Sequence, residues 1–275
     1  MATLDSGSKP RLDSAFTGSI PLIYDNCLVP MLFAPWAAEL AARIAAFEPR
    51  NVLEAAAGTG VLTELLARAM PDARIVATDL NPAMLDLARH RVPGVHLEPA
   101  DAQSLRYPDE RFDVVACQFG VMFYTDRPKA QREARRVLRD GGHYVFTVWD
   151  QIDRNPAARA VADAVAALFP TDPPHFLERT PFGHHDSSAL ADELRAVGFV
   201  DVEVASLSMP HGRVTAQDAA EGLCRGTPLS VEIDAHGLGA MERAVAAAAH
   251  ALARFAGADG RIDAPMAAHI LTATA

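Results

Sequence analysis

Residues 51–60, NVLEAAAGTG, decide how the rest of the chain is interpreted. A short apolar run ends in one carboxylate, Glu54, and is followed by small residues that include Gly58 and Gly60. The helical pattern that comes next, at residues 61–70, makes this stretch typical of the first strand–turn–helix unit of a parallel sheet. The two glycines remove Cβ atoms where a ligand would touch the main chain, and the helix start offers free N–H groups. We therefore predict a ligand site at the end of this strand.

Strand-like and helical patterns alternate up to residue 149. The strand-like stretches after the first are 74–79, 95–100, 112–119 and 142–149. The helical stretches between them include NPAMLDLARHR, which opens on a capping asparagine, and KAQREARRVLRD at 129–140, which we expect Gly141 to end. This alternation is typical of βαβ units. The predicted fold class is therefore α/β, with a parallel sheet covered by helices on both faces.

The chain outside this region is mainly helical in pattern. Residues 35–47 place four apolar side chains on one helical face: Trp36, Leu40, Ile44 and Phe47. A second face, near the C-terminal end, comprises Leu238, Met241, Val245, Leu252 and Phe255. Both faces predict core packing, although the second could instead form a roof over a substrate.

The composition is that of an ordinary globular protein, with 50% hydrophobic and 22% charged residues among 275. The formal net charge of -10 disfavours nucleic acid as a partner. Cys27, Cys117 and Cys224 are too far apart for a metal motif, so we expect no metal and three reduced thiols. The first residues lack the apolar stretch of a signal peptide, and no run of about 18 apolar residues predicts a membrane span. A cytoplasmic location is therefore expected.

The carboxylate of Glu54 helps to choose between two kinds of ligand. A dinucleotide fingerprint, G-x-G-x-x-G, centred on Gly58 would need glycines at the positions of Ala56 and Val61. Pyrophosphate is also poorly matched to a nearby acid, whereas a cationic ligand is well matched. S-adenosylmethionine carries a sulfonium and an α-ammonium group, so it is favoured over a nicotinamide dinucleotide. The alternative for Glu54 is an exposed acid at a strand end, without a ligand.

Two further acids follow later strands. Asp79 ends the second predicted strand, where a carboxylate can accept hydrogen bonds from both ribose hydroxyls. Its alternative role is to cap the next helix, for which Asn81 is also suited. Asp101 follows the third strand and could accept a hydrogen bond from an adenine amine; its alternative is an ordinary turn residue. These acids favour a ligand that contains a nucleoside.

Five motifs together resemble those of class I S-adenosylmethionine-dependent methyltransferases. The most similar branch contains the ubiquinone/menaquinone C-methyltransferases and many small-molecule methyltransferases. The motifs are VLEAAAGTG (52–60), VATDLNPAML (76–85), PADAQSL (99–105), FDVVACQFGVMF (112–123) and EARRVLRDGGHYVFTVW (133–149). One departure is Ala56, where the family more often has glycine. The resemblance implies a Rossmann-like, doubly wound sheet of seven strands, mostly parallel with an antiparallel last strand, and mainly helical cap insertions.

The resemblance also implies which residues bind S-adenosylmethionine and its product S-adenosylhomocysteine. The implied residues are Glu54, Ala56, Gly58 and Gly60 for the methionine part, Asp79, Leu80 and Met84 for the ribose and adenosine, Asp101, Ala102 and Gln103 for adenine, Gln118, Phe119 and Phe123 for the sulfonium region, and Tyr24 and Phe33 as a cover. Gln118 has the alternative of bonding only to neighbouring backbone.

Three parts of the chain are expected. Residues 1–48 would close over the cofactor, and residues 49–150 would form the core that binds S-adenosylmethionine. Residues 151–275 would contribute the last two strands, at about 199–209 and 265–274, and two cap insertions. The expected insertions are the segments of about 151–186 and 211–260.

The resemblance implies transfer of a methyl group from S-adenosylmethionine to a small-molecule acceptor by in-line displacement. The Pro, Phe and Leu content of the cap favours an apolar or aromatic acceptor. No residue is identified as catalytic; the candidates for a base are Tyr124, His184, His185 and His211. Three alternatives stay open: a protein that binds the cofactor without catalysis, a nicotinamide-dependent oxidoreductase, and methylation of a protein. The sequence does not indicate an oligomeric state.

Overall fold

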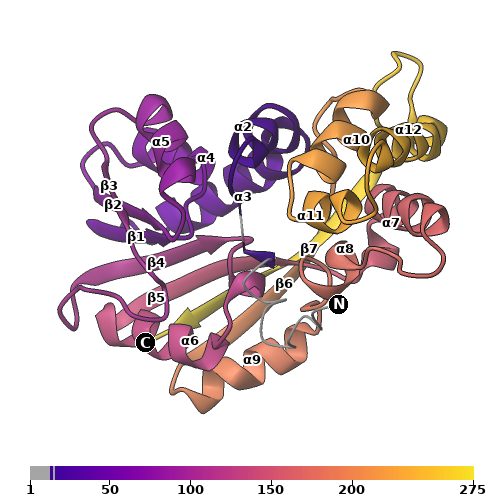
Figure 1. Ribbon diagram of the computed structural model, residues 1–275. Helices are drawn as coiled ribbons and strands as arrows, with labels where there is room; N and C mark the ends of the chain where they lie inside the picture. Colours follow the sequence, from indigo (N-terminus) through magenta and orange to yellow (C-terminus); the bar gives the residue numbers. More distant parts are fainter. Residues whose placement is uncertain (1–12, 15) are drawn as a thin grey trace.

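The sheet has the predicted architecture. The computed structural model describes residues 13–14 and 16–275, and seven strands within them form one sheet in the order β3-β2-β1-β4-β5-β7-β6 (Figure 1). The strands are β1 (Asn51–Ala55), β2 (Arg74–Asp79), β3 (His96–Pro99), β4 (Phe112–Gln118), β5 (Leu138–Trp149), β6 (Val200–Pro210) and β7 (Pro265–Thr274). β7 is antiparallel to both of its neighbours, and the other neighbouring pairs are parallel. The α/β, mostly parallel fold is therefore confirmed.

The central strands are buried on both faces, as strands of a parallel sheet should be. Leu53 of β1 pairs with Val76 of β2 on one side and with Val115 of β4 on the other, and all three side chains are buried. The strand order reverses between β1 and β4. The carboxyl ends of parallel strands flank a crevice at such a switch point, where ligands usually bind.

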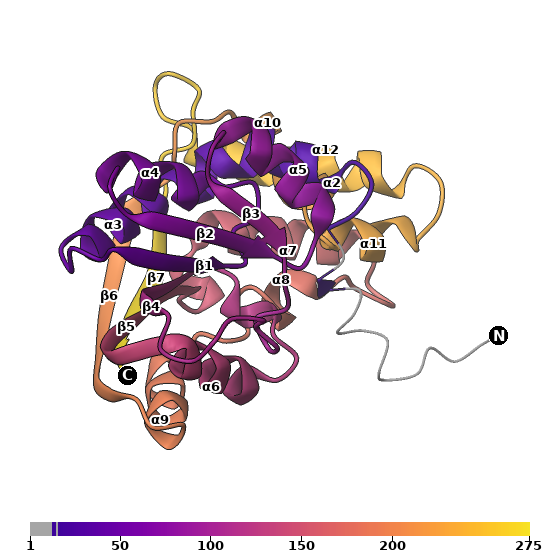
Figure 2. The ribbon, with the colours of Figure 1, turned by 90° about the vertical axis from the view of Figure 1, so that its left-hand side faces the viewer.

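Helices cover both faces of the sheet (Figure 2). One face carries α3 (Ala34–Ala45), α4 (Val61–Ala69) and α5 (Pro82–Arg91), and the other carries α6 (Arg127–Val137) and α9 (Ser187–Ala196). This is the doubly wound arrangement that the alternating pattern predicts.

Side-chain caps and sheet pairing set the helix boundaries. Asn81 caps α5, because its Oδ1 accepts a hydrogen bond at 2.9 Å from the backbone N–H two residues further on. Helix α6 ends at Val137, so its predicted extension to Asp140 is wrong. Leu138 already pairs with Phe112 in the sheet, and this pairing overrides the helix propensity of the residues that follow.

The N-terminal helix is longer than predicted. It begins at Ile20, not near Pro35, because α2 (Ile20–Ile23) and the π-helical segment η1 (Tyr24–Phe33) run directly into α3. The prediction of one apolar face holds for Trp36, Leu40 and Ile44, which are fully buried. Phe47 lies beyond the end of α3 and stacks on the ring of His143, so its place on that face is wrong.

The same continuous helix bears on the expected lack of a membrane span. By length and composition, the run Ile20–Ala45 could cross a membrane, although no such run was expected from the sequence. Core helices of globular proteins pass the same test, and about half of this run's most apolar window, 44%, is buried inside the protein. The expected absence of a signal peptide concerns residues that mostly lie outside the described part of the chain.

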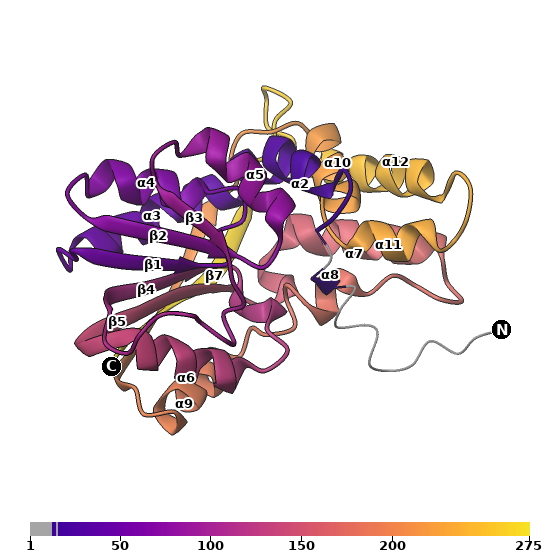
Figure 3. The same ribbon diagram turned by 60° about the vertical axis from the view of Figure 1, so that its left-hand side comes forward.

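A group of helices lies beyond the carboxyl ends of the parallel strands (Figure 3). These helices are α7 (Pro156–Leu168), α8 (Phe176–Arg179), α10 (Ala216–Arg225), α11 (Leu229–Asp234) and α12 (Ala240–Leu252), with the short 3-10 turns η2 (Val121–Phe123), η3 (Ile152–Arg154) and η4 (Ala253–Phe255) at element ends. Met241, Val245 and Leu252 are buried and Phe255 is half-buried. Leu238 is fully exposed, so the prediction that it shares their face is wrong; α12 begins only after it.

Candidate functional site

A cavity of about 400 Å³ lies where the strand ends, the N-terminal helix and the C-terminal helices meet. Its volume is in the range of small-molecule sites. The predicted cofactor residues that line it are Tyr24, Phe33, Ala56, Gly58, Asp79, Leu80, Met84, Asp101, Ala102, Gln103, Gln118, Phe119 and Phe123. The two predicted residues that do not line it are Glu54 and Gly60. Motifs that are distant in sequence are therefore gathered around one space.

Asp79 connects the ends of β1 and β2. Its Oδ2 accepts a hydrogen bond from the Gly58 N–H at 2.8 Å, and its Oδ1 accepts one from the Asn81 N–H at 2.8 Å. The helix cap is provided by Asn81 itself, so Asp79 is not needed for that role. Burial raises the pKa of Asp79, and the two N–H donors act in the opposite direction. Each carboxylate oxygen keeps a further lone pair for a ligand hydroxyl.

The turn between β1 and α4, residues 56–60, is called the glycine loop, and its main chain is open to the cavity. A Cβ on Gly58 would have one neighbour within 4 Å, the Tyr24 hydroxyl at 3.9 Å, so the peptide itself faces the space. Ala56 has φ of 55°, a conformation that glycine adopts more easily, which explains why alanine is unusual there. Gly60 has a different role, because a Cβ there would lie 3.1 Å from the Cβ of Ala88. It allows α4 and α5 to pack closely.

Glu54 lies beneath the loop and is not exposed, which contradicts the alternative of a solvated strand-end acid. Its side chain is buried, and the Thr63 hydroxyl donates a hydrogen bond to its Oε2 at 2.6 Å. Burial raises the pKa of Glu54 to about 8 from the ordinary 4.5, although the hydrogen bond from Thr63 lowers it. A cation bound close to this carboxyl group would favour its charged form and lower its pKa.

We predict that Glu54 makes the ligand-free protein less stable as the pH rises. Between the ordinary glutamate pKa and about 8, the folded state holds a proton that the unfolded state has lost, so stability falls across this window. The free energy of unfolding of the wild type relative to Glu54→Gln should fall by about 2 kcal/mol between about pH 5.5 and 7.5. Urea unfolding at several pH values measures it, and a constant difference would contradict the assignment.

Asp101 and Gln103 form a polar corner of the cavity. Asp101 Oδ1 accepts hydrogen bonds from the backbone N–H of Gln103 at 2.8 Å and from its Nε2 at 3.1 Å. Gln103 Oε1 in turn accepts from the Thr125 hydroxyl at 2.9 Å and from the Asp126 N–H at 2.7 Å. Asp101 is thus a turn residue and a lining residue together, and its second oxygen has no bond within the described part of the chain.

Aromatic rings form much of the remaining wall. Tyr24 stacks on Phe33 with centroids 4.8 Å apart, and Phe119 stacks on Trp149 at 3.9 Å. Gln118 Nε2 donates to the Phe33 carbonyl at 2.8 Å, so this side chain ties the N-terminal helix to the end of β4 and does more than satisfy its neighbours. This part of the wall is mainly aromatic.

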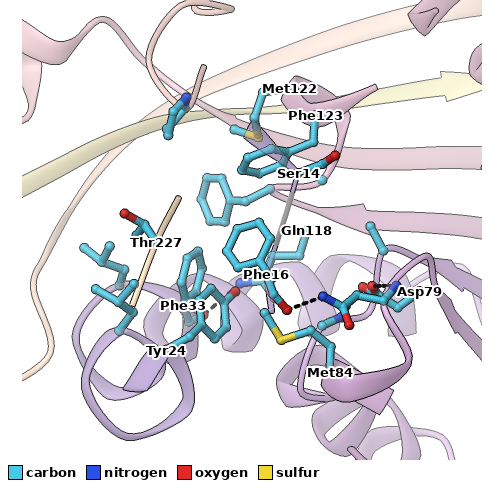
Figure 4. Close-up of a pocket in the computed structure, with 18 of the residues that line it drawn as sticks. Ser14, Phe16, Tyr24, Phe33, Asp79, Met84, Gln118, Met122, Phe123 and Thr227 are labelled. Carbon is cyan, nitrogen blue, oxygen red and sulfur yellow. Dashed lines mark hydrogen bonds between the residues drawn. The ribbon is translucent and has the colours of Figure 1, made fainter. Parts of the chain in front are cut away.

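Phe16, which is not among the predicted cofactor residues, also lines the cavity. Figure 4 shows Phe16 between Gln118 and the stacked rings, with its carbonyl bonded to the Asn81 side chain. Its ring makes edge contacts with Tyr24 and with Phe123, at 5.9 and 5.6 Å. Further back, Asp13 accepts hydrogen bonds from Arg179 and Thr180. Phe16 and Asp13 are therefore each held by hydrogen bonds to distant parts of the chain.

The candidate bases separate into two groups. Tyr124 and His211 line the cavity, whereas His184 and His185 do not. Tyr124 is 3.2 Å from the thiol of Cys117, and burial raises its pKa far above the ordinary value. Nδ1 of His184 bonds to Arg127, and Nδ1 of His185 is 2.9 Å from the Phe182 carbonyl. Among residues 13–14 and 16–275, no group of three side chains is suited to hold a metal ion.

Several lining residues are not among the predicted site residues. They include Ser14, Phe16, Thr17, Trp149, Asn155, Phe176, Phe182, Leu223 and Thr227. Of these, Trp149 ends the last motif, and the others lie outside the motifs. Most belong to segments whose sequence signal is only apolar periodicity. The glycine loop, the acid at the end of β2 and the cavity over the switch point nevertheless define the class: a Rossmann-like protein that binds a nucleoside-containing ligand.

Comparison with known proteins places the chain within that class. A family model described as methyltransferase domain matches residues 53–146. The ubiquinone/menaquinone biosynthesis C-methyltransferase UbiE of Bordetella avium is 31% identical over 177 residues, which cover 58% of this chain and 67% of that protein. The demethylmenaquinone methyltransferase of Deinococcus radiodurans is 36% identical over 138 residues, covering 49% of this chain and 55% of the relative. The chain belongs to the class I S-adenosylmethionine-dependent methyltransferases, as its motifs predicted.

Solved structures agree on the fold. A putative methyltransferase from an antibiotic biosynthesis pathway of Anabaena variabilis has a TM-score of 0.58 at 16% identity, covering 86% of this chain and 96% of that one. A possible histamine N-methyltransferase of Thermotoga maritima has a TM-score of 0.55 at 17% identity, covering 96% and 98%. Several of the curated relatives are matched over only about half of their own length. The chemical class of the acceptor is therefore inferred from the residues that line the cavity.

Proposed function

We propose that this protein transfers a methyl group from S-adenosylmethionine to a small acceptor with an apolar or aromatic body. The observation that carries the proposal is the cavity itself. Part of its lining consists of the open main chain of Gly58 and the carboxylates of Asp79 and Asp101, which we assign to the nucleoside end. Most of the other lining residues are rings and aliphatic groups, which we assign to the acceptor end. A nucleoside donor and an apolar acceptor could thus share one water-poor space.

The residues present fit S-adenosylmethionine. Asp79 has acceptor capacity for ribose hydroxyls, and the peptide of Gly58 is accessible to the methionine part. The buried carboxyl group of Glu54 beneath the loop would be stabilised in its charged form by a nearby cation. The bound donor supplies a methyl group on an activated sulfonium, so the protein mainly has to align the acceptor and exclude water.

The acceptor end has little charge. Trp149 and Phe182 have centroids 5.9 Å apart, and Phe176 and Leu177 are buried beside the same space. The amide of Asn155 is fully engaged by backbone groups of β7 and the preceding loop. Names of several relatives refer to demethylmenaquinone or to ubiquinone and menaquinone biosynthesis, which also supports a small-molecule acceptor. A nicotinamide-dependent oxidoreductase is not favoured.

The location is part of the same proposal. Cys27, Cys117 and Cys224 are all free thiols, which is the state expected in a reducing compartment. We therefore propose a cytoplasmic enzyme.

The decisive experiment uses methyl-labelled S-adenosylmethionine with a fractionated extract of the source cells. We expect label in an apolar, small-molecule fraction with the wild type and none with Asp79→Ala. Label in protein would overturn the acceptor class. Binding of S-adenosylhomocysteine without any labelled product would favour a protein that binds the cofactor and does not catalyse transfer.

A further inference from the structure

His211 lies in the wall of the cavity, and packing against its neighbours alone does not explain this position. It lies just after β6, is only 7% exposed, and lines the cavity together with Leu223 and Thr227. Figure 4 shows Thr227 on the side of the cavity away from Asp79. None of the ion pairs among the described residues includes His211. Burying an imidazole without a carboxylate partner costs free energy unless its ring nitrogens have other hydrogen-bond partners.

The contacts of His211 fix its tautomer. Nδ1 is 2.8 Å from the carbonyl oxygen of Ala264, and a carbonyl can only accept, so Nδ1 carries the proton. No hydrogen bond from a described residue reaches Nε2. Burial lowers the pKa of His211, so the ring is neutral at ordinary pH and Nε2 holds a free lone pair. This is the state that a general base requires.

The backbone around His211 is held on both sides. Its own N–H donates to the Ala264 carbonyl at 3.2 Å, and the N–H of Gly212 donates to the Met31 carbonyl at 2.8 Å. Pro35 has no N–H to offer that carbonyl four residues before it, so Gly212 supplies the missing donor. The imidazole is therefore fixed relative to the N-terminal helix and to β7.

Other titratable groups of the cavity are less suitable as a base. Tyr24 and Tyr124 have raised pKa values, so both stay protonated. Asp79 and Asp101 lie at the nucleoside end and are bound to backbone N–H groups. None of these four groups is hydrogen-bonded to the His211 ring.

We infer that His211 is the general base of the methyl transfer and that the acceptor is a hydroxylated aromatic compound whose O–H faces Nε2. This inference rests on the proposed function. The acceptor O–H bond breaks and its proton moves to Nε2, while the electron pair left on the phenolate forms the bond to the methyl carbon. The methyl–sulfur bond breaks with its electrons on sulfur, giving S-adenosylhomocysteine. His211 then releases the proton to water.

The test compares two phenols of different acidity, 2-naphthol and 4-nitrophenol. Replacing His211 with glutamine keeps a similar volume and removes the proton acceptor. We expect methylation of 2-naphthol at neutral pH to fall by about 10²–10⁴-fold. For 4-nitrophenol, assayed above its own pKa, the acceptor is already ionised and the loss should shrink to less than about tenfold. A merely structural role would reduce both rates equally, and equal losses would overturn the inference.

A matched control is available in His185, whose Nδ1 also contacts a backbone carbonyl but which lies outside the cavity. His185→Gln should leave both rates unchanged. Calorimetry should give the same affinity for S-adenosylhomocysteine in His211→Gln and the wild type. Nitrogen NMR of histidine-labelled protein should show the His211 proton on Nδ1 and a shifted Nε2 signal when 2-naphthol and S-adenosylhomocysteine are added.

The remaining outcomes separate this inference from the proposed function. If the wild type methylates an amine or thiol from the extract but no phenol, the inference fails and the methyltransferase stands. A proton found on Nε2 would also overturn it. If the protein binds S-adenosylhomocysteine and methylates nothing, the proposed function fails and the inference fails with it.

Discussion

Replacing Asp79 with alanine should weaken binding of S-adenosylhomocysteine by about 10²–10⁴-fold. Two hydrogen bonds from ribose hydroxyls to a carboxylate contribute about 1.5–3 kcal/mol each, and every 1.4 kcal/mol is a factor of about ten in affinity. The substitution also releases the N–H of Gly58, so the glycine loop loses the anchor that fixes its shape. Isothermal calorimetry measures the affinity directly.

The control for this prediction is Asp86→Ala. Asp86 lies on the exposed side of α5, and within the described part of the chain it pairs only with Arg89. Its removal should leave the affinity unchanged. The stability of Asp79→Ala without ligand should be close to that of the wild type, because burying this carboxylate already costs free energy. A folded Asp79→Ala protein with wild-type affinity would remove Asp79 from the site.

Local sequence signals were sufficient to place three of the predicted residues in or just after their strands. Glu54 is the last residue but one of β1, Gly58 lies in the turn after β1, and Asp79 ends β2. Parallel strands then bring those ends together, whatever the rest of the chain does. The seven-stranded sheet was predicted from the family resemblance, which rests on motifs at the same strand ends.

The cover of the site depended on contacts between distant segments. Phe16 is placed by Asn81, and His211 is placed by Ala264 and by Gly212 docking on the N-terminal helix. No periodicity encodes such pairings. Pro30 within the π-helical segment also interrupts the helical pattern, so the helix was predicted to begin too late. The side chain of Glu54 is buried beneath the loop, where the Thr63 hydroxyl donates a hydrogen bond to it.

The second large expected effect is on stability, and it concerns the packing of Gly212 against the N-terminal helix. Gly212→Ala should lower the free energy of unfolding by about 2–4 kcal/mol. An added Cβ would lie 1.7 Å from the Pro30 carbonyl oxygen and 3.2 Å from the Cα of Met31. These are backbone atoms of a packed helix and cannot rotate away, so the loop must move and lose its hydrogen bond to Met31.

Gly257→Ala is the matched control, because a Cβ there would find its nearest atom at 3.5 Å, an ordinary contact. Its effect in urea unfolding should stay within about 0.5 kcal/mol. Equal effects of the two substitutions would contradict the docking. The same displacement would move His211, the preceding residue, away from the acceptor end. Gly212→Ala should therefore lower methyl transfer more than it lowers affinity for S-adenosylhomocysteine. The hydrogen bond between Asp79 and Gly58 does not involve the loop of Gly212 and should remain.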